Sequence, residues 1–192
     1  MIRLFCRAVG SLLMMCAAAG FAAEETGPGA ASADNAALAK QTLQVGPGVT
    51  LAGALLPDAV RHLAATGALV LDLRGASEGA DTEARAMALA GVDYVHLPQT
   101  AAPPAPADVA FLRDLLAVNN HRGVVIHCAS GNRAALLWGA YRLDQGAALP
   151  DVLEQVRPIA TKQATRQGIA TYAASRQAPA GNGGSADQGH RP

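Results

Sequence analysis

Aromatic residues are scarce in this sequence of 192 residues, which contains three Phe, three Tyr and one Trp. About half of the chain is apolar nonetheless, which is enough to bury one sizeable core but not two. Alanine and glycine are abundant, so we expect helices that pack closely through small side chains. The composition therefore predicts a single folded domain.

An excess of charge of one sign is absent as well. Lys and Arg number 15, Asp and Glu number 15, and no run of basic residues occurs in the chain. A basic patch or stripe is the electrostatic footprint of a protein that binds nucleic acid. We therefore expect no nucleic-acid partner.

The N-terminus contains an apolar run, but a short one. Val9 to Ala19 is too short to cross a bilayer comfortably. Arg3 and Arg7 precede this run, and small residues follow it up to Ala23. This order is typical of a secretory signal peptide, with a retained anchor helix as the alternative. We expect residues 1–23 to be removed, a periplasmic or secreted location, and no membrane association after cleavage.

Cysteine is scarce as well. Of Cys6, Cys16 and Cys128, the first two leave with the signal peptide, so the mature chain keeps Cys128 alone. An exported protein with one cysteine forms no internal disulfide. Cys128 is then either a buried, inert thiol or a reactive group, and its neighbours favour the second interpretation.

In the remaining chain, short apolar runs typical of strands alternate with segments whose apolar residues have the spacing of a helix. Residues 24–41 are predicted to be a flexible linker, 42–176 a single domain, and 177–192 a disordered tail rich in glycine. Strand-to-helix alternation predicts an α/β fold with a small, central, mostly parallel sheet flanked by helices. The expected strands are one or two within 42–54, then 68–73, 92–97 and 123–127; the expected helices are 57–65, 81–90, 107 or 108 to 118, 131–143, 150–156 and 161–175.

The segment from His127 to Arg133 contains the residues best suited to catalysis. It lies between a predicted strand and a predicted helix, at the carboxyl edge where open α/β sheets place their sites. A helix N-terminus lowers the pKa of a cysteine, and the cysteine thiolate is a nucleophile. Arg133 offers a planar fork that matches a tetrahedral oxyanion. We predict Cys128 and Arg133 as catalytic residues.

The rest of this loop is predicted to bind the substrate. Successive amide groups from Ala129 through Asn132 can form a nest for an anion, and Gly131 lets the backbone curl. Ser130 is a candidate hydrogen-bond partner of the sulfur. His127 either orients the loop or is a histidine satisfied within the core. The expected partner is a small oxyanion or phosphate ester; no metal or cofactor is expected, and the oligomeric state is left open.

Together these residues resemble a known family. His127-Cys128 followed by Gly131 and Arg133 looks like the protein tyrosine phosphatase superfamily. The stretch from about 53 to 168 is more closely similar to the beta-lactamase-hydrolase-like phosphatase-like domain. The resemblance implies a protein tyrosine phosphatase-like fold with Cys128 as nucleophile and Arg133 as oxyanion binder. Its supporting elements here read Leu71-Asp72-Leu73-Arg74, Glu78, Tyr94-Val95-His96-Leu97-Pro98 and the cysteine loop.

Two departures from the superfamily pattern keep other functions open. Four residues separate Cys128 from Arg133, whereas the superfamily carries five, and four with a glycine before the arginine also resembles rhodanese-type sulfurtransferases. The superfamily's general acid is an Asp in the loop after the Tyr-containing strand, but residues 98–107 contain no acidic residue. The candidates are Asp72, unless Arg74 binds it, Glu78, and Asp108, which is more readily interpreted as a helix N-cap.

Three functions therefore remain. The first is an exported cysteine-dependent hydrolase that forms a thiophosphoryl intermediate on Cys128, with Asp72 as a further candidate catalytic residue. The second is a rhodanese-type sulfurtransferase carrying a persulfide on Cys128. The third is a catalytically weak module that binds an oxyanion in the same loop. Fold alone does not choose among them.

Overall fold

Strands and helices alternate along the chain in the computed structural model, which describes residues 37–177. The strands are β1 (Thr42–Gly46), β2 (Val49–Ala52), β3 (Leu69–Asp72), β4 (Tyr94–His96) and β5 (Val124–His127). The helices are α2 (Ala59–Thr66), α3 (Ala80–Leu89), α4 (Pro106–Val118), α5 (Asn132–Asp144), α6 (Leu149–Val156) and α7 (Gln163–Gln177), with one 3-10 turn at Ala76–Glu78. The predicted fold class is confirmed.

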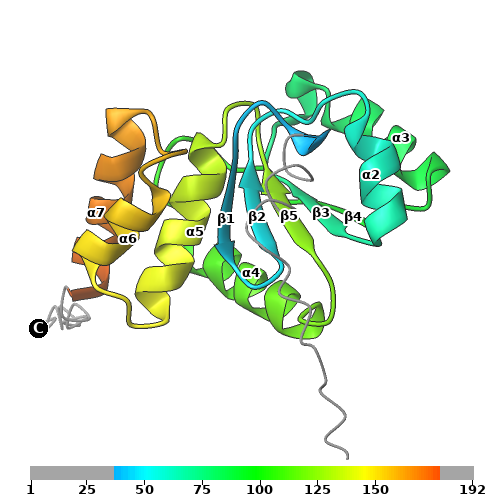
Figure 1. The fold of residues 1–192 in the computed structure, drawn as a ribbon. Coiled ribbons are helices and arrows are strands. Elements are labelled where there is room, and N and C mark those ends of the chain that lie inside the picture. The colour runs from blue at the N-terminus through cyan, green and yellow to red at the C-terminus, as the bar shows by residue number, and fades with distance from the viewer. Residues whose placement is uncertain (1–36, 178–192) are drawn as a thin grey trace, which may run out of the picture.

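The five strands form one sheet in the order β1-β2-β5-β3-β4. β1 and β2 are an antiparallel hairpin, and the other neighbouring pairs are parallel. β5 lies in the centre, paired with β2 on one side and β3 on the other, as Figure 1 shows. The residue that follows β5 therefore emerges at the middle of the carboxyl edge, the position expected for a site in a parallel sheet.

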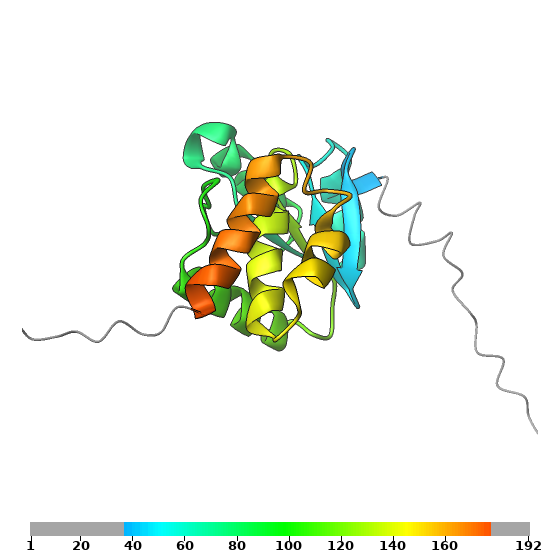
Figure 2. The same cartoon turned by 90° about the vertical axis from the view of Figure 1, so that its left-hand side faces the viewer.

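Side-chain alternation sorts the two faces of the sheet into separate clusters. Val124 and Ile126 of β5 join the larger cluster with α4, α5, α6 and α7, whereas Val125 joins the smaller cluster with α2 and α3. Successive residues of a strand point to opposite faces, so neighbours in sequence enter different layers. Figure 2 shows α5, α6 and α7 side by side over one face.

α5 is the buried centre of the larger layer. Leu137, Trp138 and Ala140 are among its nine buried residues, which spread around the whole helix. Gly139 allows α7 to approach closely, because a Cβ there would lie 2.9 Å from Ile169. Small side chains thus provide the close helix packing that the composition predicted.

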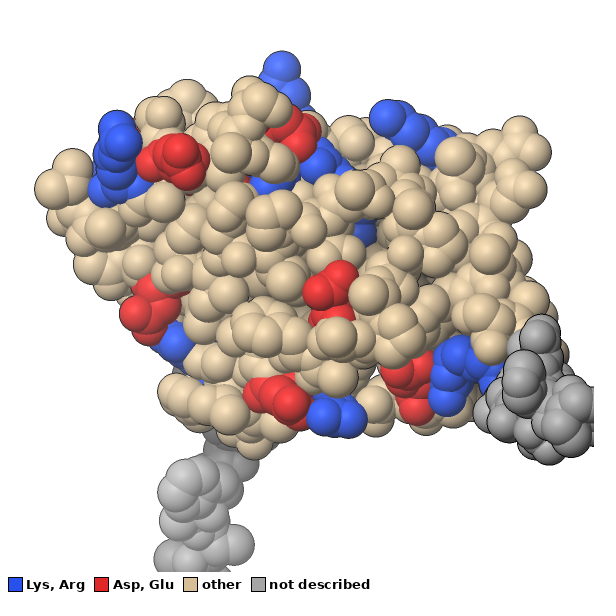
Figure 3. Space-filling model, turned by 180° about the vertical axis from the view of Figure 1, so that it is seen from behind, with Lys and Arg blue, Asp and Glu red and all other residues tan. Residues whose placement is uncertain are grey.

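The folded unit starts slightly earlier than predicted. Leu38 and Ala39 were placed in a flexible linker, but both are buried, and Leu38 accepts a backbone hydrogen bond from Leu56. The predicted signal peptide and most of the predicted linker and tail lie outside the described residues. No helix within residues 37–177 has the length and apolar character needed to cross a membrane. On the face seen in Figure 3, acidic and basic side chains lie scattered, often beside one another.

Candidate active site

The cysteine loop connects the central strand to the most buried helix. β5 ends at His127, α5 begins at Asn132, and Gly131 between them has a φ of +77°. A Cβ at Gly131 would lie 2.6 Å from the Cδ1 atom of Ile159, which follows α6. Both the left-handed backbone and the close approach therefore require glycine at this position.

Cys128 lies at the base of this loop. It is a free cysteine with no exposed surface, and it belongs to the cluster on the α5 face of the sheet. Its amide donates to the carbonyl of Ala52 in β2, at 3.3 Å. The next amides behave differently: those of Ser130, Asn132 and Arg133 have no hydrogen-bond acceptor among residues 37–177. Unpaired amides at a helix N-terminus attract an anion.

Arg133 is fixed over the loop by several acceptors. Its two terminal nitrogens donate to the carboxylate of Glu78 at 2.7 and 2.6 Å, and one of them also reaches the carbonyls of Leu73 and Gln99 at 3.3 Å. The hydrogen bond to Glu78 and the nearby Cys128 raise the pKa of the Arg133 guanidinium, although burial opposes them. Arg133 is thus a permanent positive charge held beside the sulfur.

A cavity of about 340 Å³ opens beside the loop. Cys128 itself is not among the lining residues, and it has no exposed surface. The cavity is large enough for a phosphate group and part of the group esterified to it. It is lined by Glu78, Thr100, Ala101, Ala129, Ser130, Asn132, Arg133, Leu136, Lys162, Ala164 and Thr165.

Asn132 ties the loop to the start of α7. Its side-chain oxygen accepts hydrogen bonds from the Lys162 amide at 3.0 Å and the Thr165 hydroxyl at 2.9 Å. Its side-chain nitrogen donates to the hydroxyls of Thr161 at 3.1 Å and Ser130 at 3.2 Å. Asn132 therefore uses its side chain to shape the loop. The hydroxyl of Ser130 bonds to Asn132, and the predicted contact with the sulfur is not among the hydrogen bonds of the described residues.

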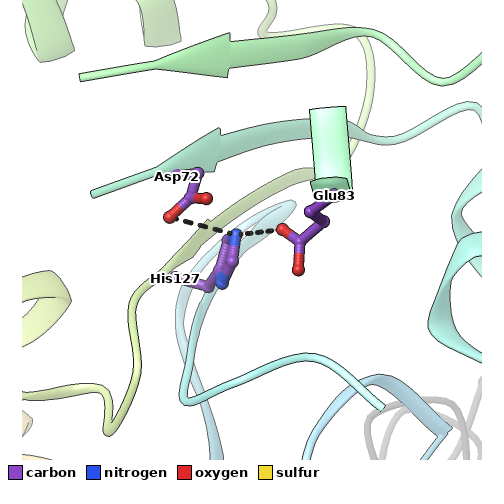
Figure 4. A group of neighbouring side chains, drawn as sticks. All are labelled: Asp72, Glu83 and His127. Carbon is purple, nitrogen blue, oxygen red and sulfur yellow. Dashed lines mark ion pairs between the residues drawn. The ribbon is translucent and has the colours of Figure 1, made fainter. Parts of the chain in front are cut away.

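His127 lies on the opposite face of the sheet from Cys128. Its side chain is fully buried, with Nε2 2.9 Å from Glu83 Oε1 and 3.6 Å from Asp72 Oδ1, as Figure 4 shows. The contact with Glu83 is short but lacks the angle of a hydrogen bond, so both ring nitrogens remain without a hydrogen-bond partner among the described residues. The structure therefore gives His127 a buried setting away from the cavity, which does not suit the predicted contact with substrate.

Asp72 belongs to the same buried group. Arg74 donates to its two oxygens at distances of 2.7 to 3.0 Å, and the Tyr94 hydroxyl donates to it at 2.5 Å. Burial alone would raise the pKa of Asp72, but the hydrogen bonds from Arg74 and Tyr94 and the adjacent His127 hold it below its usual value. A general acid needs a raised pKa and access to the leaving group. Asp72 has neither, and it has the setting of a structural carboxylate.

Asp72, Glu83 and His127 also place three ligand-type atoms within 4.8 Å of one another. Arg74 donates to Asp72 at 2.7 Å and pairs with Glu83 at 2.9 Å, so the protein itself supplies the positive charge that these carboxylates need. A divalent cation would lie against that guanidinium. The donor set therefore fits an internal ion-pair network better than a metal site.

Comparisons with known proteins identify the family and the fold of this chain. The sequence model of the family described as "Beta-lactamase hydrolase-like protein, phosphatase-like domain" matches residues 41–147, more than half of the chain. The chain belongs to this family. No curated protein sequence matches it.

Solved structures show the same fold. A putative phosphatase from Shewanella putrefaciens CN-32 is 20% identical with a TM-score of 0.58, over 75% of this chain and 93% of that one. A putative phosphatase from Neisseria meningitidis Z2491 is 21% identical with a TM-score of 0.57, over 68% and 96%. TpbA from P. aeruginosa, in complex with pTyr, is 20% identical with a TM-score of 0.50, over 72% and 96%. These likenesses establish the fold of the phosphatase-like domain.

The other two candidate acids of this phosphatase-like domain are also engaged. The hydrogen bond from Arg133 lowers the pKa of Glu78 to about 2, with a further contribution from the Gly75 amide. Asp108 was interpreted as a helix N-cap, but α4 begins at Pro106, and Asp108 instead accepts a hydrogen bond from the side chain of Gln99 at 3.0 Å. The N-cap interpretation is therefore wrong: proline, preset for a first helical turn, starts α4 two residues earlier.

Sequence reasoning missed the far side of the cavity in this phosphatase-like domain. Lys162 and Thr165 lie about 30 residues after the loop, in a stretch that was interpreted only as a closing helix. A lysine before a helix and a threonine in its first turn carry no signal that distinguishes them from ordinary helix residues. Glu83 was also missed, because one acidic residue in an amphipathic helix does not reveal which buried group it meets.

Proposed function

We propose that this chain is a cysteine-dependent phosphatase that acts on a phosphate ester through a thiophosphoryl intermediate on Cys128. The observation that carries the proposal is that Cys128, the one cysteine among residues 37–177, lies buried beside a fixed Arg133 and unpaired loop amides at the N-terminus of α5. Membership of a phosphatase-like family supports the same chemistry.

The reaction has two displacement steps at phosphorus. In the first, the Cys128 thiolate forms an S–P bond, the P–O bond of the ester breaks, and the leaving oxygen takes a proton from solvent water. In the second, water attacks phosphorus, the S–P bond breaks, and phosphate and thiolate are released. Arg133 and the loop amides would bind the three equatorial oxygens, whose charge grows in each transition state.

The leaving oxygen's proton has no evident donor among the described carboxylates. Asp72 is buried and paired, and Glu78 is held ionised by Arg133. Loss of a general acid costs about 10²–10⁴ in rate, and the cost grows with the basicity of the leaving group. We therefore expect aryl phosphates to be hydrolysed far faster than alkyl phosphates.

Hydrolysis of 4-nitrophenyl phosphate by the purified mature protein tests this function. We expect activity that vanadate inhibits and that Cys128→Ser abolishes. Absence of turnover by the wild-type protein between mildly acidic and neutral pH would overturn the proposal.

A sulfurtransferase is the second candidate, and two observations favour it. The loop has four residues between Cys128 and Arg133, and persulfide transfer does not need the missing general acid. Here Cys128 would take the sulfane sulfur of thiosulfate, releasing sulfite, and pass it to a thiophilic acceptor. Mass spectrometry of thiosulfate-treated protein decides this: unmodified Cys128 rules the candidate out, and a persulfide supports it.

We also propose export to the periplasm or the exterior. The support is the order of charged, apolar and small residues in 1–23. Cell fractionation of the expressed full chain, with N-terminal sequencing, tests this. A mature N-terminus close to residue 24 in the exported fraction is expected, whereas an intact N-terminus in the cytoplasm would contradict it.

A further inference from the structure

The cavity beside the cysteine loop holds a positive charge that the reaction at phosphorus does not use. Lys162, directly before α7, lines this cavity together with Arg133 and Glu78. Glu78 is the acidic residue of this lining, and Arg133 binds both of its oxygens. Among residues 37–177, Lys162 has no carboxylate partner. One positive charge of the cavity is therefore left uncompensated.

The cysteine loop holds the backbone of Lys162 in place, and the side chain of Lys162 is exposed. The Lys162 amide donates to Asn132 Oδ1 at 3.0 Å, and the hydroxyl of Thr165, in the first turn of α7, donates to the same oxygen at 2.9 Å. Asn132 and Thr165 are each only 6% exposed, so these bonds are shielded from water. The backbone from which the Lys162 side chain extends is thus tied to the cysteine loop.

The helix that follows Lys162 adds to the attraction for an anion. α7 starts at Gln163 and is 15 residues long, so its N-terminus carries the partial positive charge of a helix dipole. The cavity wall formed by Ala164 and Thr165 belongs to that first turn. An anion near Lys162 would therefore meet a full charge and a helix N-terminus, while Arg133 and the loop amides hold the scissile phosphate.

We propose that Lys162 recognises a second anionic group on the substrate, so that preferred substrates are phosphate esters carrying an additional carboxylate or phosphate. This inference rests on the proposed phosphatase function and deepens it, because it names the substrate class. It makes Lys162 a specificity-determining residue.

A second lysine provides a matched comparison. Lys40 lines a different cavity, of about 500 Å³, which also contacts Ala129 and Ser130 of the loop. Arg133 is absent from that cavity's lining. Lys40→Gln therefore removes the same charge near the same loop, but away from the cavity that contains Arg133.

The test compares phenyl phosphate with its 3-carboxy and 4-carboxy derivatives at constant ionic strength. Because Lys162 is exposed and an ion pair in contact with water is weak, we expect kcat/KM for the better carboxy ester to exceed that for phenyl phosphate by about threefold to fivefold. Lys162→Gln is expected to bring this ratio close to one, whereas Lys162→Arg and Lys40→Gln keep it. A ratio near one in the wild-type protein, a ratio that survives Lys162→Gln, or a ratio lost in Lys40→Gln overturns the inference.

A binding measurement separates this inference from the proposed function. If the wild-type protein hydrolyses neither 4-nitrophenyl phosphate nor any of the three esters, the phosphatase proposal fails, and calorimetry with Cys128→Ser then compares the affinities of the three esters. Tighter binding of a carboxy ester that disappears in the Cys128→Ser/Lys162→Gln double variant supports the role of Lys162. Equal affinities for all three esters, or binding of none, overturn it.

Discussion

His127 and Cys128 are adjacent in sequence, yet they serve two regions with opposite properties. His127 lies on the α2–α3 face among Asp72, Arg74 and Glu83, where the charges are buried and paired with one another. Cys128 lies on the α5 face, below a loop whose amides and Arg133 border an open cavity. The alternation of a single strand separates the two regions.

The two regions differ in how far their charged groups are paired within the protein. In the buried group, two carboxylates face one arginine and one histidine, and they hold the ends of β3 and β5 together. At the cysteine loop, Arg133 has a single carboxylate partner and the loop amides have none among the described residues, so positive potential remains for a ligand. One region stabilises the carboxyl edge of the sheet, and the other is free to bind an anion.

The largest effect is expected when the proposed nucleophile, Cys128, is replaced. Cys128→Ser keeps the size of the buried side chain but lacks a thiolate, so we expect the hydrolysis of 4-nitrophenyl phosphate to fall by at least about 10³-fold. Thermal denaturation is the control and should show a midpoint close to that of the wild-type protein. Activity within tenfold of wild type would show that Cys128 is not the nucleophile.

The next largest effect is expected when the guanidinium of Arg133 is replaced by an amine. Arg133→Lys keeps the charge but cannot bind Glu78 and an oxyanion in the same planar arrangement, so we expect kcat/KM to fall by about 10²-fold. The matched control is Arg157→Lys, which alters an exposed pair with Glu154 on α6. Equal effects of the two substitutions would contradict a special role for Arg133.

The buried group should respond in stability rather than in chemistry. Asp72→Asn leaves Arg74 without its closest charge partner, and breaking a buried pair costs about 3 kcal/mol in the free energy of unfolding. Urea denaturation at neutral pH measures this. Asp114→Asn is the control, because its pair with Arg113 is exposed, and no measurable change is expected there.

The pH dependence of stability tests whether Asp72 is ionised and paired in the folded protein. The pKa of Asp72 is lower in the folded protein than in the unfolded chain, so its contribution is complete above about pH 4, the ordinary value for Asp. The contribution is lost as the pH falls through the lower, folded value. Asp72→Asn should therefore flatten the acid limb of the stability curve; an unchanged acid limb would contradict the ionised, paired state of Asp72.

The smallest expected effect concerns loop geometry. Gly131→Ala adds a methyl group against Ile159 to a left-handed backbone, and we expect a loss of about 2 kcal/mol, measured by urea denaturation. Gly67→Ala is the matched control: its φ is +64°, but nothing lies within 4 Å, so only the backbone cost of about 1 kcal/mol applies. An equal loss in both variants would show that the contact with Ile159 is unimportant.

The elements of the fold were predictable because their signals are local. Short apolar runs bounded by glycine or proline located β3 and β5, and the position of Cys128 at the carboxyl edge followed from parallel pairing. The order of the strands was not predictable, because it depends on which crossovers pack together. Leu38 was assigned to a linker, since two apolar residues in an Ala-rich stretch do not reveal that they cover β2 and α2.

The candidate site was predictable only where it is continuous in sequence. Cys128, Gly131 and Arg133 were found from one motif, whereas Lys162 contributes to the cavity through tertiary contacts. The sequence does not predict whether His127 orients the loop or lies within the core, because a residue at the end of a strand can point to either face of the sheet. Asp72 was considered both as an acid and as a partner of Arg74, and only the folded geometry shows the bidentate pair.

The central claim is that Cys128 forms a covalent bond to phosphorus. The most direct measurement is rapid acid quenching of the protein during turnover of an aryl phosphate, followed by mass spectrometry of the peptide containing Cys128. The account predicts a mass increase of one phosphoryl group on Cys128 that is absent from Cys128→Ser. An unmodified Cys128 under turnover, together with addition of a single sulfur after thiosulfate treatment, would contradict it.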